Sequence, residues 1–166
     1  MYTVIDVETT GLSPEKNRIT EIALYNVDGD KITKVYSTLV NPKQYSPKFV
    51  QMATGISNEM VHDAPTFDQV AKKIKRLFRN RQFVAHNADF DYRMLHAEFK
   101  RAGLPFRRKK MCTLKMSREL LPGRKSYKLG TLCEDLGIEL KNAHRASADA
   151  LATSHLLTKL LAIRAA

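Results

Sequence analysis

The sequence predicts an α/β protein in which a mixed β-sheet is flanked by helices. Strand-like segments come first along the chain, and helical segments interleaved with short strands follow, an order typical of such folds. The chain has 166 residues and no internal repeat or linker, so we expect a single domain over residues 1–166. Hydrophobic residues make up 43% and charged residues 27%, which favours a globular protein over a disordered one.

Three strands are expected at the start of the chain. Residues 1–8 are rich in apolar residues and are followed by the breakers Gly11, Ser13 and Pro14. Residues 19–27 and 32–40 are the next two candidates. They are separated by Asp28-Gly29-Asp30, a hairpin signal. The sheet is therefore expected to begin as an antiparallel meander.

Helices dominate the rest of the chain. Two short segments, around residues 47–53 and 58–61, come first. Asn87 can cap a helix that begins just after a short buried strand at 83–85 and stops at Gly103. The remaining helices are expected from apolar spacing at residues 66–79, 114–121, 129 to about 137, and 146–163.

The charge balance points to a polyanionic partner. Lysine and arginine total 28 against 17 acids, giving a formal net charge of +11. Nucleic acid is the leading candidate, an anionic membrane surface is second, and a merely soluble basic protein is the alternative.

The two cysteines, Cys112 and Cys133, lack a CxxC partner or a metal-spaced histidine. This spacing argues against a zinc site and favours reduced thiols. No apolar run reaches membrane-spanning length and no signal-peptide pattern opens the chain, so we expect a cytoplasmic protein without a membrane partner.

Two acids near the start share one face of a strand. Asp6 and Glu8 are two residues apart, so their side chains project from the same face, about 6.6 Å apart along the strand. They would repel each other and resist desolvation unless a cation compensated them. The alternative is a solvated face of an edge strand.

Two further acids interrupt apolar helical stripes. Asp91 has Met94 and Leu95 at i+3 and i+4, so it points with the apolar side of its helix. Asp149 lies in a helix that is apolar around it. Asp89 differs, because an acid at a helix N-terminus is explained by the helix dipole.

His144 precedes Asp149 by five residues. Alone it would be an ordinary surface or structural histidine. If the helix begins at Ala146 or Ser147, His144 lies in the loop before it and can lean over the site that Asp149 faces. Carboxylate oxygens are suitable ligands for Mg²⁺ or Mn²⁺. Two such ions about 3.5–4 Å apart can stabilise a phosphoryl displacement. An imidazole can accept the proton of the attacking water. These residues therefore fit metal-assisted phosphodiester hydrolysis.

Three motifs in order resemble a known family. Residues 6–11 (Asp-Val-Glu-Thr-Thr-Gly), residues 86–91 (His-Asn-Ala-Asp-Phe-Asp), and His144 with Asp149 match the DEDD-type 3′→5′ exonucleases. The histidine-bearing subclass is indicated, because the tyrosine-bearing subclass has Tyr where this chain has Arg145. The chain is similar to the exonuclease domain of bacterial proofreading subunits such as epsilon of DNA polymerase III. The resemblance implies a ribonuclease-H-like fold with a mixed five-stranded sheet.

The resemblance also implies roles for individual residues. Asp6, Glu8, Asp91 and Asp149 would hold two metal ions, and His144 would be the general base. Further positions would bind the substrate: Thr9, Thr10 and Gly11 through their backbone, Leu12 against the terminal base, Ile56 as an apolar wedge, and His86 and Asn87 by direct contact. Core packing is the alternative for Leu12 and Ile56, and a helix cap is the alternative for Asn87.

The expected reaction is release of nucleoside monophosphates from the 3′ end of single-stranded DNA. A proofreading or repair role, with a DNA polymerase as partner, would follow from the resemblance. RNA or short oligoribonucleotides are the alternative substrates. A catalytically silent nucleic-acid-binding module is the alternative from another class, and retention of all five site residues argues against it.

Two dense basic stretches, residues 72–76 and 107–110, could follow the phosphates of a bound strand. A solvated helix face and a solvated loop are the alternatives, and the apolar spacing favours the solvated face for the first stretch. Phe106 and Tyr127 offer possible surfaces for base stacking.

Overall fold

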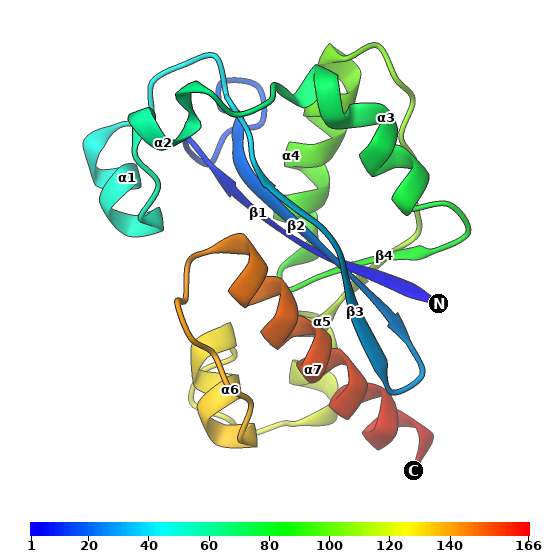
Figure 1. Ribbon diagram of the computed structural model, residues 1–166. Helices are drawn as coiled ribbons and strands as arrows, with labels where there is room; N and C mark the ends of the chain where they lie inside the picture. Colours follow the sequence, from blue (N-terminus) through cyan, green and yellow to red (C-terminus); the bar gives the residue numbers. More distant parts are fainter.

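The computed structural model describes residues 1–166 and contains a five-stranded sheet in the order β3-β2-β1-β4-β5 (Figure 1). The central strand β1 pairs antiparallel with β2 and parallel with β4. The edge strands continue each pattern, since β3 is antiparallel to β2 and β5 is parallel to β4. The strands are β1 (Tyr2–Thr9), β2 (Ile19–Asp28), β3 (Lys31–Leu39), β4 (Gln82–Ala85) and β5 (Lys110–Cys112). The mixed five-stranded sheet is therefore confirmed.

Helices cover both faces of the sheet, and two short helices lie at one end (Figure 1). One face carries α3 (Phe67–Leu77) and α4 (Ala88–Arg101). The other carries α5 (Thr113–Leu120), α6 (Leu129–Leu136) and α7 (Ala146–Ala165), while α1 (Lys48–Thr54) and α2 (Asn58–His62) are the short pair. None of these helices combines the length and apolar character needed to cross a membrane.

The alternation of side chains along β1 divides the core into two clusters. Ile5 and Val7 pack with α3 and α4, whereas Val4 packs with α7 on the opposite face. Period-2 alternation sends successive side chains to opposite faces, so a strand buried on both faces needs apolar residues at both parities. The even positions of β1 beyond Val4 are Asp6 and Glu8, which therefore face the α7 layer.

The predicted elements agree with the structure except in two places. Strand β5 was not predicted, because a three-residue strand beside Arg107, Arg108 and Lys109 shows no hydrophobic alternation. Asn87 precedes α4 as predicted, but the expected side-chain cap is wrong. Its φ of 67° is left-handed, and its side chain makes no capping hydrogen bond.

Candidate active site

Three of the predicted acids come together from two elements. Asp6 and Glu8 project from β1, and Asp149 lies in the first turn of α7. One carboxylate oxygen from each lies within 4.8 Å of the others. The clustering follows from the fold, because α7 packs across β1 on the face to which its even-numbered side chains point.

Asp91 joins the cluster from the opposite layer. It lies in the first turn of α4, is 4% exposed, and accepts a hydrogen bond from the Val7 N–H at 3.2 Å. Val7 lies between Asp6 and Glu8 on β1, and the charge of Asp91 raises the pKa of Asp6. The four acids predicted from the sequence therefore converge on the central strand.

The carboxylates raise one another's pKa. Burial, followed by the neighbouring charges of Asp91, Glu8 and Asp149, raises the pKa of Asp6 well above its ordinary value. Burial, followed by Asp149 and Glu21, raises the pKa of Glu8 to about 8. Burial raises the pKa of Asp91 to about 8 and also raises the pKa of Asp149. The ionised cluster is therefore short of positive charge.

A divalent cation fits this cluster. Asp6 Oδ2 is buried and has no hydrogen-bond partner within the protein, a costly state for a carboxylate oxygen. Hard divalent cations prefer several carboxylate oxygens at one site. Asp6, Glu8 and Asp149 are placed to hold such an ion, and Asp91 contacts the backbone of Val7 between the first two.

His144 lies in the loop before α7, as the sequence predicts, because the helix begins at Ala146. Its backbone φ is +68°, in the left-handed region that non-glycine residues seldom adopt. The His144 N–H donates to Asp149 Oδ2 at 3.1 Å, which ties the loop to the acid cluster. Its side chain is exposed, and its ring makes no hydrogen bond with the protein.

An ion pair that the sequence reasoning missed anchors the same loop. Arg145, the N-cap residue of α7, places its Nε 2.8 Å from Glu21 Oε2. Glu21 is buried in β2 directly opposite Glu8. The loop between β1 and β2 is too long and irregular for the sequence to reveal this register, and no local signal links Glu21 to a residue 124 positions away.

The turn after β1 leaves the Leu12 side chain exposed. Thr9 and Thr10 are buried, and Thr9 Oγ1 donates to the Gly11 carbonyl at 2.6 Å. A Cβ at Gly11 would lie 2.6 Å from the Asn17 side chain, which would have to move to accommodate it. Leu12 is 81% exposed, which leaves it free for contact with a ligand.

The remaining predicted contact residues differ in availability. Ile56 is 2% exposed, as the core-packing alternative predicts, and its side chain is therefore not available as an apolar wedge against the substrate. Both ring nitrogens of His86 have internal partners, Thr113 Oγ1 at 2.9 Å and the Tyr127 carbonyl at 2.8 Å, and burial lowers the pKa of His86. Asn87 is exposed in the hollow that also contains Asp6.

Phe106, considered above as a stacking surface, is 4% exposed and packs against Phe78 and Phe99. The exposed surface that stacking requires is therefore absent at this residue. Tyr127 is half-buried and lines the hollow with His86.

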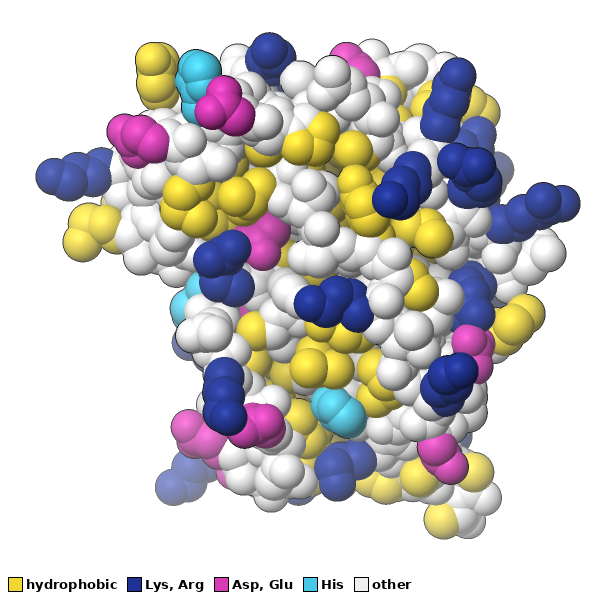
Figure 2. All heavy atoms as spheres, in the orientation of Figure 1, with side chains coloured by type: hydrophobic (Ala, Val, Ile, Leu, Met, Phe, Trp, Pro, Cys, Tyr) yellow, Lys and Arg dark blue, Asp and Glu magenta, His cyan; other side chains and the backbone are white.

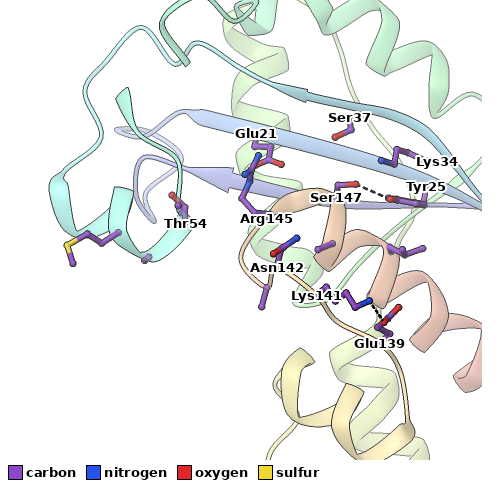
Figure 3. Close-up of a pocket in the computed structure, with 16 residues that line it drawn as sticks. Glu21, Tyr25, Lys34, Ser37, Thr54, Glu139, Lys141, Asn142, Arg145 and Ser147 are labelled. Carbon is purple, nitrogen blue, oxygen red and sulfur yellow. Dashed lines mark hydrogen bonds and ion pairs between the residues drawn. The ribbon is translucent and has the colours of Figure 1, made fainter. Parts of the chain in front are cut away.

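Two hollows flank the loop that carries His144. The first, about 870 Å³, contains Asp6, Asp149 and His144 together with cations from the α5–α6 region. Those cations are Arg118, Lys125 and Lys128. The second, about 910 Å³, lies over β2 and β3 (Figure 3). There Arg145 reaches toward Glu21, and Thr54 lies across from the loop (Figure 3).

Comparisons with known sequences identify the family. Residues 3–157 match the RNase T family, described as exonucleases. The epsilon subunit of DNA polymerase III from Aquifex aeolicus is 34% identical over 161 residues, 96% of this chain and 80% of that protein. PolC-type DNA polymerase III from Bacillus cereus is 40% identical over 161 residues, 96% of this chain. The 3′-5′ exonuclease DinG of Bacillus subtilis is 37% identical over 162 residues. The chain spans only 11% of that PolC and 17% of that DinG.

Solved structures share the fold. Exonuclease X in complex with 5′-overhanging duplex DNA is 28% identical, with a TM-score of 0.81 over 100% of this chain and 94% of that chain. The zinc-bound form of the Escherichia coli exonuclease I–single-stranded DNA complex has a TM-score of 0.85 over 98% of this chain and 40% of that chain. Its 21% identity shows the fold alone. This chain belongs to the exonuclease family, as a DEDD-type 3′→5′ exonuclease domain with the ribonuclease-H-like fold that its motifs predict.

Proposed function

We propose that the protein hydrolyses phosphodiester bonds at the 3′ end of single-stranded DNA and releases nucleoside monophosphates. The observation that carries this proposal is the cluster of carboxylate oxygens from Asp6, Glu8 and Asp149 within 4.8 Å, to which the His144 loop is tied. Such a cluster needs an external cation, and a polyanionic substrate suits the formal charge of +11.

Exonucleases of this family depend on divalent metal ions. We assign two ions, Mg²⁺ or Mn²⁺, to Asp6, Glu8, Asp91 and Asp149. When bound, such ions stabilise the charge on the attacking and leaving oxygens of a phosphoryl displacement. The protein contributes a preorganised set of carboxylates, one buried and three half-buried, that need not reorganise when charge develops.

We assign the role of general base to His144. The oxygen of a water molecule bonds to phosphorus, and the water's proton passes to the imidazole. The bond from phosphorus to the 3′ oxygen of the preceding nucleotide breaks, and that oxygen keeps the bonding electron pair and takes up a proton from solvent. The hydrogen bond from the His144 N–H to Asp149 fixes where the loop sits, and the exposed ring is free to approach the water. The products are a nucleoside monophosphate and a strand shortened by one nucleotide.

The terminal nucleotide is proposed to lie against the turn after β1. Backbone groups of residues 9–11 and the exposed side chain of Leu12 would hold it, and Asn87 would contact it from the adjoining hollow. His86 would act indirectly, because its ring is engaged with Thr113 and with the Tyr127 carbonyl and so shapes the hollow wall.

The test is digestion of end-labelled single-stranded DNA, duplex DNA and RNA side by side, with Mg²⁺, Mn²⁺ or chelator. We expect stepwise shortening from the 3′ end of single-stranded DNA with added metal and none in chelator. Robust cleavage in chelator would overturn the metal-dependent mechanism. Faster digestion of RNA would assign an exoribonuclease instead, and binding without cleavage would assign a silent module.

A proofreading or repair role, with a DNA polymerase as partner, is the cellular setting we propose, because relatives include an epsilon subunit and PolC-type polymerases. A proofreading enzyme removes unpaired termini faster than paired ones. We therefore expect primer–template DNA with a mismatched 3′ end to be digested faster than its matched counterpart. Equal rates would argue against proofreading.

A further inference from the structure

A strongly basic hollow lies on the α3 side of the molecule, away from the acid cluster. It has a volume of about 570 Å³, and besides Leu104 every residue that lines it is a cation. We call it the α3 hollow; its cations are Lys72, Lys75, Arg76, Arg79 and Arg108.

These cations have no acidic partner within the protein. None of the five forms an ion pair, whereas Lys110 pairs with Asp89 and Lys141 pairs with Glu139 elsewhere on the surface. Clustered like charges without counter-charges repel one another and destabilise the folded state slightly. The arrangement therefore offers a positive field that an external anion can neutralise.

The α3 hollow brings together cations from the two basic stretches of the sequence, residues 72–76 and 107–110. Apolar spacing on α3 explains why Val70 and Ile74 face the core, but it does not explain why Arg108 lies beside the helix. Arg108 is held there by its Nε donating to the Phe78 carbonyl at 3.0 Å and by its N–H donating to the Tyr92 hydroxyl at 3.2 Å. One wall of the hollow is thus fixed in advance, which lowers the entropic cost of binding.

The hollow is remote from the terminal nucleotide. The chain leaves α3 and enters β4 at Gln82, which pairs with Tyr2 at the start of β1, whereas Asp6 and Glu8 lie four to six residues further along that strand. At about 3.3 Å per residue, Tyr2 lies roughly 13–20 Å from Asp6 and Glu8 along β1. In addition, α3 covers the face of the sheet opposite to the one that these two acids face. Figure 2 shows Lys and Arg side chains gathered over α3 on the right, with others between them and the left side of this face.

We propose that the α3 hollow binds the phosphate backbone of the nucleic acid whose 3′ end occupies the candidate active site. The proposal rests on the proposed function and adds an anchoring site several nucleotides from the scissile bond. Uncompensated lysines and arginines suit phosphates, because their contacts release counterions and require no particular base sequence.

The experiment measures binding and turnover of the full chain on a long DNA strand of about 30 nucleotides and on a short one of about four. The test variant is Lys72→Glu/Arg76→Glu, and Lys72→Gln/Arg76→Gln removes the charges without reversing them. The matched control is Lys159→Glu/Arg164→Glu, which makes the same charge change on exposed residues of α7 that make no ion pair. Circular dichroism checks that all variants are folded.

We expect Lys72→Glu/Arg76→Glu to bind the long strand roughly 10- to 30-fold more weakly at about 100 mM salt. The slope of log affinity against log salt should shrink by about 1.4, since each neutralised phosphate of a single strand contributes about 0.7. KM for the long strand should rise while kcat on the short strand is unchanged, and the control should follow the wild type.

An unchanged affinity and an unchanged salt slope for the long strand would overturn the proposal. The α3 hollow would then have to bind a different polyanion, such as an acidic protein segment. An equal loss in the Lys159→Glu/Arg164→Glu control would also overturn it, because the effect would then reflect net charge alone. Binding is measured in chelator and needs no cleavage. A wild type that binds DNA without cutting it would therefore contradict the proposed function while still testing the hollow.

Discussion

Buried acids occur in two regions of this protein, and their partners differ. Glu98 on α4 is 1% exposed, and its two carboxylate oxygens accept from Arg18 Nε and Nη2 at 2.9 Å each and from the Ile19 N–H at 3.0 Å. Asp6 in the acid cluster has a buried oxygen with no partner, and its nearest charges are other carboxylates. The first arrangement is complete within the chain, whereas the second needs something from outside it.

Glu21 stands between these two cases. It lies opposite Glu8 at the edge of the acid cluster, yet its charge is matched by Arg145. Burial alone therefore does not distinguish a structural acid from a functional one. The presence or absence of an internal cation does, and the predictions that follow test this distinction.

The largest effect is expected from Asp149→Asn. Loss of one metal-binding carboxylate should lower kcat on single-stranded DNA at least about 1000-fold, since metal ions contribute several kcal/mol to phosphoryl transfer. Thermal unfolding in chelator should occur at the same temperature as in the wild type or higher, because the substitution removes a repelling charge. Initial rates and melting curves measure the two effects.

Asp89→Asn is the matched control for Asp149→Asn. Asp89 also lies in a first helical turn, but it is exposed and paired with Lys110 and Lys115. Its loss should leave kcat and the melting temperature close to those of the wild type. Turnover of Asp149→Asn within tenfold of the wild type would contradict the assignment of that carboxylate.

Glu98→Gln should show the opposite pattern. Removing one partner of a buried ion pair leaves Arg18 unmatched, and we expect a loss of about 3 kcal/mol in the free energy of unfolding. For a chain of this length that corresponds to roughly 10 °C in Tm. Below the melting temperature kcat should change less than tenfold, and a loss of activity without a loss of stability would contradict the structural role.

The contrast between Glu98 and Asp91 shows where sequence reasoning stops. Both acids lie on α4 among apolar residues, yet the sequence predicts a functional role only for Asp91, through its motif and its neighbours Met94 and Leu95. Glu98 is explained by Arg18, which is 80 positions away. A single sequence indicates that an acid lies on an apolar face, but a distant partner becomes visible only when the fold is known.

The same limit applies to the sheet and the site. Strands β1 to β3 follow from apolar segments and a hairpin signal, and His144 falls in a loop because α7 starts where its periodicity starts. The register that sets Glu8 opposite Glu21 depends on the irregular connection between β1 and β2. For that reason the Arg145 anchor could not be predicted, whereas the four acids could.

Arg145→Ala should have an intermediate effect. Without the guanidinium, Glu21 is left buried and unpaired, and the loop carrying His144 loses one of its two ties to the sheet and helix. We expect kcat to fall roughly 10- to 100-fold, about 1.4–2.7 kcal/mol, with KM little changed. Steady-state kinetics on single-stranded DNA measure the two constants separately.

Arg145→Lys separates charge from geometry at this position. Lysine keeps the charge but loses the planar donor group, so it should recover part of the lost kcat. If Arg145→Lys were no more active than Arg145→Ala, the geometry of the guanidinium would matter more than its charge. Wild-type kcat in Arg145→Ala would show that the Glu21 pair does not position the loop.

The smallest effect concerns the pH dependence of stability without metal. The pKa of Glu8 is about 8 in the folded protein against an ordinary 4.5, so the folded state holds a proton that the unfolded state has lost between these values. Stability should therefore fall as the pH rises from about 4.5 to about 8. Allowing for solvent access to the partly exposed side chain, we expect roughly 1–2 kcal/mol, or about 3–6 °C in Tm.

Melting curves of the wild type in chelator at pH 6 and pH 8.5 measure this loss, with Glu8→Gln as the variant that cannot titrate there. Its curves should differ less between the two pH values. Added Mg²⁺ should stabilise the wild type more at the higher pH, because the ion binds the ionised carboxylates that are otherwise unfavourable. If stability in chelator instead rose with pH, as it does for an acid matched by an internal cation, the acid cluster would belong with Glu98, and the distinction between the two regions would be wrong.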